Sequence, residues 1–357
     1  MKILFTFYNP SGGMETLNRV RSRALMRAGH ECHLLYTHDG QGRKNISGIK
    51  TFVTGNDFLI ERLIERESYD VIVVCTDIFL MEKIRNWAYE GTVIFEVQGL
   101  GTYETASAIL EDFAPRVRVY ADALLYPKTD HLIELMRRLF PQLPHFCFDD
   151  PLDAEQFGYE SYPKKPYPIL GWVGRLEKNK NWQDYLLIGA NLRGYYPQLQ
   201  LWMFDDNTLS DPPEKAAFEQ TLQYLKLSDR LVRHSNIPHG QMADYLSIIG
   251  DSGGFLCSTS IMEGFGYAVA EAMLCRCPVL STDSDGVRRF IRHDKTGKFY
   301  RRGDIAHATE EALSLMSDLA LRAAIVESAE KHIRSSFSAH LYAKQFMRMM
   351  RQLGRNE

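Results

Sequence analysis

Two glutamates at the ends of the segment EGFGYAVAE, Glu263 and Glu271, are the residues whose types and spacing most clearly suggest chemistry. Gly264 and Gly266 lie between them and allow backbone conformations that a Cβ would forbid, and the alanine-rich stretch that follows favours a helix. The free N–H groups at the start of such a helix attract an anion such as a phosphate. Because carboxylates repel an anion, the glutamates are better suited to a neutral, hydroxylated group attached to it. A nucleotide sugar combines these parts.

A second group of charges lies in GWVGRLEKNKNW (171–182), directly after an apolar run. Arg175 and Lys180 fall on a strand-to-helix connection, the edge at which open α/β sheets bind ligands. A guanidinium fork and an ammonium at that edge could hold a diphosphate together. Basic residues are also common in loops without a function, so this segment alone leaves both interpretations open.

Short apolar runs that alternate with helical patterns must position these residues. The runs are 2–8, 32–37, 71–75, 93–97 and 123–126 in a first series, and 169–173, 199–204, 231–233, 254–257 and 278–281 in a second. Continuous Val, Ile and Leu runs between helices are typical of parallel sheets covered on both faces. The proline-rich segment 159–168 between the two series is typical of a linker.

The sequence therefore predicts two tandem Rossmann-like, doubly wound α/β domains with a cleft between them. The predicted domains are residues 1–160 and residues 161–335. A C-terminal amphipathic helix, 336–357, is expected to pack on a domain and could cross back to the first one.

Composition excludes several classes of protein. The chain has 357 residues, 45% hydrophobic and 24% charged, which is ordinary for a globular protein, and its net charge of −3 does not indicate nucleic-acid binding. Its six cysteines form no CxxC pair, and no apolar run approaches the roughly 18 residues of a membrane span. The apolar run before Asn9 is too short for a signal peptide. We expect a cytoplasmic protein, with peripheral contact to the inner face of the membrane as an option.

Three motifs in order carry a resemblance to a known family. They are GRLEKNKN (174–181), HSNIPHGQMADYL (234–246) and STSIMEGFGYAVAEAMLCRCPVLSTDSDG (258–286). Together they resemble the sugar-nucleotide domain of the family 4 retaining glycosyltransferases, which have the two-domain GT-B fold and an E-x7-E motif. In the first half the resemblance rests on SGGMETLNR (11–19), which is similar to the family's glycine-rich first loop.

The resemblance implies a retaining, metal-independent transfer of a sugar from a nucleoside-diphosphate sugar to a hydroxyl acceptor, with no further cofactor. The acceptor class would be a glycan, a glycolipid or a small glycoside, as in polysaccharide biosynthesis, bound mainly by the first domain. Arg175 and Lys180 match the pair that neutralises the donor diphosphate. Glu263 matches the glutamate beside the donor sugar, and Glu271 matches the one that binds the ribose hydroxyls.

Further positions follow from the same resemblance. The backbone of Gly264, Phe265 and Gly266 would meet the donor sugar and phosphate, and the Asn236–Ile237 turn would meet the base. The pair Gly12 and Gly13 would close over the diphosphate from the first domain. On the acceptor side the expected residues are Gln98, Tyr103 and Glu104.

The chain departs from the family pattern at several positions. After the apolar run that ends near Val97, Gln98 occupies the position of a family histidine; a glutamine can donate a hydrogen bond but cannot act as a base. Arg276 replaces a glycine at the end of a predicted helix, and Asp285-Gly286 replaces a pair of glycines. These changes concern the donor sugar and the acceptor chemistry more than the nucleotide.

Alternative interpretations remain open from the sequence. A GT-B sugar-nucleotide epimerase or hydrolase would turn over donor without acceptor. A dinucleotide-dependent oxidoreductase is less consistent, since VIFEVQGLGTYE (93–104) lacks the third glycine of its motif. The triplet Asp283-Ser284-Asp285 could bind a metal in another glycosyltransferase fold. Arg19, Arg23 and Arg27 form either a solvated stripe or a surface for anionic lipid or acceptor. Among the histidines, His239 is the weakest candidate, because a turn after Pro238 explains it.

Overall fold

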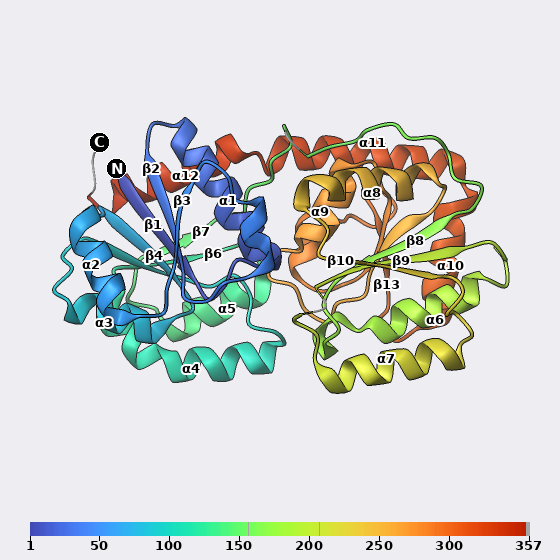
Figure 1. Cartoon of the computed structure of the whole chain (residues 1–357). Coiled ribbons are helices and arrows are strands. Elements are labelled where there is room, and N and C mark those ends of the chain that lie inside the picture. The colour runs from blue at the N-terminus through green and yellow to red at the C-terminus, as the bar shows by residue number, and fades with distance from the viewer. Residues whose placement is uncertain (156, 207, 355–357) are drawn as a thin grey trace. The chain divides into compact units, whose positions relative to one another are not determined.

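The computed structural model describes residues 1–155, 157–206 and 208–354, and these form two compact units. The first unit comprises residues 1–153 together with 337–357, and the second comprises residues 154–336 (Figure 1). The division falls between Asp153 and Ala154, whereas the sequence suggested 160/161. The C-terminal helix belongs to the first unit, and residues 355–357 at its end lie outside the described residues.

The first unit is a parallel sheet of seven strands with helices on both faces. Its elements are β1 (Lys2–Phe7), α1 (Gly12–Arg27), β2 (Glu31–Tyr36), the 3₁₀ helix η1 (Gln41–Asn45), β3 (Lys50–Val53), α2 (Asp57–Glu67), β4 (Val71–Cys75), α3 (Ile78–Asn86), β5 (Thr92–Glu96), α4 (Tyr103–Tyr120), β6 (Ala123–Tyr126), α5 (Asp130–Leu139), β7 (His145–Cys147) and α12 (Ala339–Gln352). The strand order is β3-β2-β1-β4-β5-β6-β7, so the chain reverses its winding direction after β3.

Alternating side chains along each strand divide the first unit into two cores. On β1, Leu4 packs with residues of α2 to α5, whereas Ile3 and Phe5 face α1 and α12. Phe346 of α12 meets Phe5 edge to face, with 5.9 Å between the ring centroids. The C-terminal helix is therefore part of the core of the first unit, as Figure 1 shows by its place beside α1.

The second unit is a parallel sheet of six strands in the order β10-β9-β8-β11-β12-β13. Its elements are β8 (Ile169–Val173), the 3₁₀ helix η2 (Lys178–Lys180), α6 (Trp182–Leu192), β9 (Gln200–Asp205), α7 (Pro212–Tyr224), β10 (Leu231–Ser235), α8 (His239–Asp251), β11 (Phe255–Ser258), α9 (Tyr267–Leu274), β12 (Val279–Thr282), the 3₁₀ helix η3 (Gly286–Arg289), β13 (Lys298–Tyr300), α10 (Ile305–Ser317) and α11 (Leu319–Ser336). The predicted pair of doubly wound parallel sheets is thus confirmed.

Local chemistry sets several helix starts. Side chains at the position before the first helical residue accept a backbone N–H and so satisfy one free donor of the helix. These caps are Asn56 for α2, Asp77 for α3, Thr102 for α4, Asp304 for α10 and Ser338 for α12. Among the described residues, no helix is both long enough and apolar enough to cross a membrane.

The predicted linker is part of the second unit. Tyr159 donates from its hydroxyl to Asp251 at the end of α8, and the backbone N–H of Tyr162 donates to the same carboxylate at 3.2 Å. The segment before β8 is therefore held along α8 by hydrogen bonds.

Candidate active site

The loop from Thr259 to Gly266 follows β11 and carries Glu263. Asn179, in η2, clamps this loop: its side-chain nitrogen donates to the carbonyl of Met262 at 2.9 Å, and its side-chain oxygen accepts from the N–H of the same residue at 3.2 Å. On the other side, the hydroxyl of Thr282 at the end of β12 donates to the carbonyl of Ser260 at 2.5 Å. Neighbouring strand ends on both sides therefore fix the position of the loop.

Glu263 and Lys180 form an ion pair at this edge of the sheet. The distance from Lys180 Nζ to Glu263 Oε1 is 2.5 Å, and the hydroxyl of Ser260 donates to the same oxygen at 2.6 Å. Both charged side chains keep about a fifth of their surface exposed, at 20% and 18%. Two residues that the sequence placed in one site are thus in direct contact and remain accessible.

Arg175 lies at the end of the adjacent strand, β8, but it does not join this pair. Its guanidinium is half exposed, at 49%, and lies 3.2 Å from the carboxylate of Glu177. The structure therefore gives Lys180 a fixed partner within the predicted site and leaves Arg175 on the accessible edge of the same strand end.

Gly266, the second glycine of EGFG, is required by the backbone that leads into α9. Gly266 has φ +96°, and a Cβ there would lie 2.9 Å from the side chain of Val287. Phe265 is 5% exposed and packs edge to face on Phe290 at 4.8 Å. Its ring therefore belongs to the core of the second unit.

The segment after β12 closes against the same loop. A Cβ at Gly286 would lie 2.7 Å from the carbonyl oxygens of Glu263 and Gly264. Asp285, where the family has a glycine, takes a left-handed conformation with φ +63°, and so does Arg276 after α9, with φ +54°. At both positions where the chain departs from the family pattern, a residue with a Cβ thus adopts a positive φ, a conformation that favours glycine.

Glu271 lies in the second turn of α9 and contacts a histidine. His239 Nε2 is 2.7 Å from Glu271 Oε1, and the two side chains are 16% and 12% exposed. The ring of Phe157 lies against His239 at 4.8 Å between centroids. With its proton on Nε2, His239 donates to one oxygen of Glu271 and fixes the orientation of the carboxylate.

His239, which ranked lowest from the sequence, lies in contact with a predicted site residue. It is the first residue of α8, and from the sequence a turn after Pro238 was a sufficient reason for a histidine at this position. Only the packing of α8 against α9 brings it to Glu271, which lies 32 positions further along the chain. No motif in the sequence carries that information.

The Asn236–Ile237 turn follows β10 and is anchored to β9. Asn236 has a left-handed φ of +55°, and its N–H donates to the carbonyl of Asp205 at 2.9 Å. The carboxylate of Asp205 is in turn bound by Arg233 at 2.7 Å and by the hydroxyl of Ser235. A turn with a left-handed residue thus lies at the carboxyl ends of the strands, the edge at which open α/β sheets bind ligands.

The remaining predicted residues belong to the first unit. Gly12 and Gly13 open α1 directly after β1, and Gly12 has φ +54°. The side-chain nitrogen of Gln98, after β5, donates to Glu96 at 3.0 Å and to Asp150 at 3.1 Å. Tyr103 and Glu104 are the first two residues of α4, and the hydroxyl of Tyr103 donates to Glu134 at 2.7 Å.

Two alternatives from the sequence are disfavoured by side-chain pairing. Arg288 lies 2.6 Å from the carboxylate of Asp283 and 3.2 Å from that of Asp285, so a guanidinium occupies the place between the two acids of the DxD triplet. Arg19 is only 5% exposed and pairs with Glu15 at 2.6 Å. The expected basic stripe of Arg19, Arg23 and Arg27 on α1 is therefore wrong.

The second unit matches a known family. Residues 157–332, a little under half of the chain, match the family model described as glycosyl transferases group 1. A 2-deoxystreptamine N-acetyl-D-glucosaminyltransferase of Streptomyces fradiae is 24% identical over 157 residues, 42% of this chain and 34% of the relative. An alpha-D-kanosaminyltransferase of Streptomyces kanamyceticus is 24% identical over 270 residues, 71% of this chain and 66% of the relative. The matches thus span from a third to two thirds of these relatives' lengths.

Solved structures extend the likeness to both units. A sucrose-phosphate synthase from Thermosynechococcus elongatus superposes with a TM-score of 0.81 at 16% identity, over 99% of each chain. Anabaena Alr3699/HepE, solved in complex with UDP-glucose, superposes with a TM-score of 0.82 at 16% identity, over 99% of this chain and 100% of that one. These likenesses establish the GT-B fold.

Proposed function

From the match of residues 157–332 to the glycosyl transferases group 1 family model, we propose that the protein is a retaining, metal-independent glycosyltransferase. Its donor would be a nucleoside-diphosphate sugar, and its acceptor a hydroxyl of a glycan, glycolipid or small glycoside. The observation that carries the proposal is the contact between Lys180 and Glu263 beside the Glu271–His239 pair. The six cysteines, all free and five of them buried, support a cytoplasmic location.

In this proposal Lys180 and Arg175 bind the donor diphosphate. As the bond between the sugar and the diphosphate breaks, negative charge accumulates on the diphosphate oxygens, so cations fixed beside them act more strongly in the transition state than in the ground state. The ammonium of Lys180 is held in place by Glu263, whereas the guanidinium of Arg175 is more exposed, at 49%, and pairs with Glu177. Glu263 would face the donor sugar and stabilise positive charge that develops at its anomeric carbon.

Glu271 would bind the ribose hydroxyls of the nucleotide. One of its oxygens is held by His239, which leaves the other to accept from a hydroxyl. Anabaena Alr3699/HepE has been solved with UDP and with UDP-glucose, which makes a uridine nucleotide the first donor to try. The acceptor hydroxyl would lose its proton to a diphosphate oxygen on the face from which the diphosphate leaves, and this gives retention.

A nucleotide screen followed by product analysis tests the function. UDP, GDP, ADP and dTDP would be compared by the shift in unfolding temperature, because a ligand that binds the native state stabilises it. The matching nucleotide sugars would then be incubated with and without sugar acceptors, and the anomeric configuration of the product read by proton NMR. Inversion would contradict the retaining mechanism, and donor turnover without acceptor would favour an epimerase or hydrolase. If no nucleotide binds, the proposed function is wrong.

Replacing Glu271 with alanine should weaken binding of the nucleotide by about tenfold or more, because a hydrogen bond to a charged group contributes about 1.5–3 kcal/mol. Isothermal titration with UDP, or with the nucleotide that the screen selects, measures this loss. Glu310→Ala, an exposed glutamate of α10, is the matched control and should bind as the wild type does. Equal affinity in the two variants would remove Glu271 from the nucleotide site.

Replacing His239 with leucine should weaken the same binding less, by about threefold to tenfold, the effect of one hydrogen bond of about 0.5–1.5 kcal/mol. His239 acts only through Glu271 in this proposal. The loss should therefore disappear when Glu271 is already alanine, and a double-mutant cycle measured by titration checks that. Additive losses in the double variant would show that His239 acts independently.

A further inference from the structure

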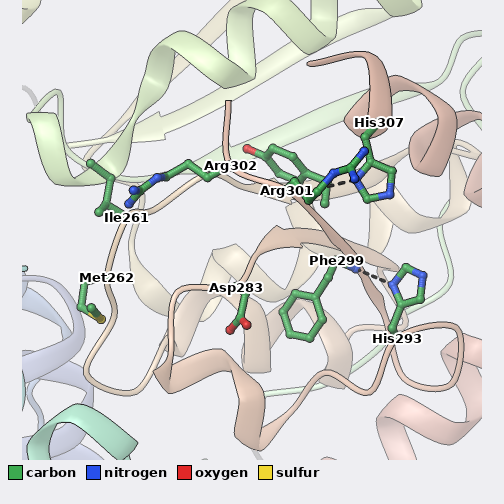
Figure 2. Close-up of a pocket in the computed structure, with 9 residues that line it drawn as sticks. Ile261, Met262, Asp283, His293, Phe299, Arg301, Arg302 and His307 are labelled. Carbon is green, nitrogen blue, oxygen red and sulfur yellow. Dashed lines mark hydrogen bonds between the residues drawn. The ribbon is translucent and has the colours of Figure 1, made fainter. Parts of the chain in front are cut away.

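We propose that an open cavity beside the Glu263 loop is a subsite for a negatively charged sugar. The inference rests on the proposed function, which it deepens by naming a class of acceptor or effector. The cavity has a volume of about 630 Å³, within the range of small-molecule sites. Figure 2 shows its lining residues, which come from the Glu263 loop, from the end of β12 and from the region around β13.

The cavity lies on the other side of the Glu263 loop from Lys180. The strand order β8-β11-β12-β13 places Lys180 after β8, the loop after β11, and the cavity along the ends of β12 and β13. Ile261 and Met262 form one wall, and Met262 directly precedes Glu263. A ligand in the cavity would therefore touch the segment that holds the proposed catalytic carboxylate.

Most polar groups that line the cavity already have structural partners. The Nδ1 atoms of His293 and His307 accept backbone N–H groups of Phe299 and Arg301 at 3.0 and 3.1 Å, so both rings are held as acceptors at that nitrogen. The guanidinium of Arg301 lies 2.8 Å from Asp304. These residues shape the cavity rather than bind a ligand.

Arg302 is the exception. It is exposed, and the described residues offer its guanidinium neither a hydrogen bond nor an ion pair. In Figure 2 its side chain extends along Ile261 on the rim of the cavity. A long basic side chain that lies along an apolar wall keeps its charged end in solvent. An anionic group of a ligand could pair with it without breaking any existing contact.

Two further residues of the cavity, Asp283 and Phe299, suit the hydroxyls and the apolar face of a sugar. Asp283 lies between Met262 and Phe299 in Figure 2, and Arg288 binds both of its oxygens, at 2.6 and 3.1 Å. A carboxylate has about four acceptor positions, so Asp283 can still accept from ligand hydroxyls. Phe299 is half-buried and offers an apolar ring. A cation, a hydroxyl acceptor and an apolar face together suit a pyranose that bears a carboxylate or a phosphate.

Ligand-observed NMR with methyl β-D-glucuronide, methyl β-D-glucoside and glucose 6-phosphate tests the subsite in the absence of nucleotide. We expect the two anionic probes to bind at least tenfold more tightly than the neutral glucoside. Arg302→Gln should abolish that difference, since a charge-assisted bond is lost. Arg301→Gln is the matched control, with the same change on the same rim, and should keep the difference. Anionic probes that bind wild type and Arg302→Gln equally, or bind neither, would overturn the subsite.

Nucleotide binding separates this inference from the proposed function. Arg302→Gln should bind UDP, or the nucleotide that the screen selects, as the wild type does. If no nucleotide binds any variant, the proposed function fails, while the probe measurements still decide the subsite.

Transfer kinetics decide whether the anionic sugar is part of the acceptor or a separate effector. A raised KM only for acceptors that carry a uronate identifies an acceptor subsite. A change in rate on adding glucose 6-phosphate at saturating acceptor identifies an effector. If neither effect occurs, the cavity has no role in transfer.

Discussion

Lys180→Ala is expected to slow sugar transfer by about 100- to 1000-fold, the effect of removing one fixed donor from the charge that develops in a transition state. Lys180 is suited to this size of effect because its ammonium is fixed rather than free: it lies 2.5 Å from Glu263, in a turn that also clamps the catalytic loop. Its loss would also leave the carboxylate of Glu263 with one side-chain partner among the described residues, the hydroxyl of Ser260. The reduction should appear mainly in kcat, since the lost interaction strengthens as the donor bond breaks.

The control for Lys180→Ala lies in the same 3₁₀ turn. Lys178 is exposed, and Lys178→Ala should transfer sugar at nearly the wild-type rate. Both variants would be assayed at saturating donor, and their unfolding temperatures compared with that of the wild type. A kcat of Lys180→Ala within threefold of that of Lys178→Ala would remove Lys180 from the catalytic residues. Lys180→Arg should recover only part of the rate, because a guanidinium fork does not replace a compact ammonium.

The sequence predicted the central strands of both sheets and missed three strands at their edges. β3 and β7 flank the first sheet and β13 flanks the second. In β3 and β7 no residue is fully buried, so neither strand shows the continuous apolar run that marks a strand covered on both faces. β13 has three residues and is part of the cavity wall. Hydrophobic patterning therefore predicts the central strands of a parallel sheet but can miss the strands at its edges.

The candidate site also has features that the sequence predicted and contacts that it did not predict. The loop and the start of α9 follow from motifs whose order and spacing were visible in the chain, and the same motifs placed Lys180 and Glu263 in one site without predicting their direct contact. The contact of His239 with Glu271 was not visible, since it depends on how α8 packs against α9. Spacing along a chain predicts contacts within a helix or a loop, but it carries no information on which faces of two helices meet.

Arg19 shows how periodicity can also mislead. Its spacing from Arg23 and Arg27 places all three on one face of α1, and a basic face is normally solvated. Glu15, one turn earlier, is itself 2% exposed and pairs with Arg19. Asn45 of η1 donates to Glu15 at 3.3 Å, so the turn after β2 lies over this end of the helix. A contact between distant segments thus removes one member of the stripe from the surface.

Buried charged side chains of the first unit hold Gln98 in the interior by hydrogen bonds. Arg21 and Glu96 are both 0% exposed and form a two-armed pair at 2.5 and 2.9 Å. Asp150 is 2% exposed, and burial, together with the negative charge of Glu96, raises its pKa well above the ordinary value. The neutral form of Asp150 is therefore favoured, and Arg21 balances Glu96 alone. Gln98 bridges the two carboxyl groups.

Arg21→Met should destabilise the protein by about 3–5 kcal/mol, because it leaves the charge of Glu96 buried without a cation to balance it. The packing volume is nearly kept, so the loss comes from electrostatics rather than from a cavity. Urea unfolding of the whole protein, followed by a probe in the first unit, measures the change. Arg27→Met, on the exposed part of the same helix, is the matched control and should change the free energy of unfolding by no more than about 0.5 kcal/mol.

The double variant Arg21→Met, Glu96→Met shows where the loss of stability in Arg21→Met comes from. It separates the loss of the ion pair from the cost of leaving the charge of Glu96 unbalanced. Removing both charges leaves an apolar contact of similar volume, which is often as stable as the buried pair it replaces. We therefore expect the double variant to recover most of the stability that Arg21→Met loses. A double variant less stable than Arg21→Met would contradict this expectation and would mean that Glu96 stabilises the unit through contacts other than its pair with Arg21, such as the hydrogen bond that it accepts from Gln98.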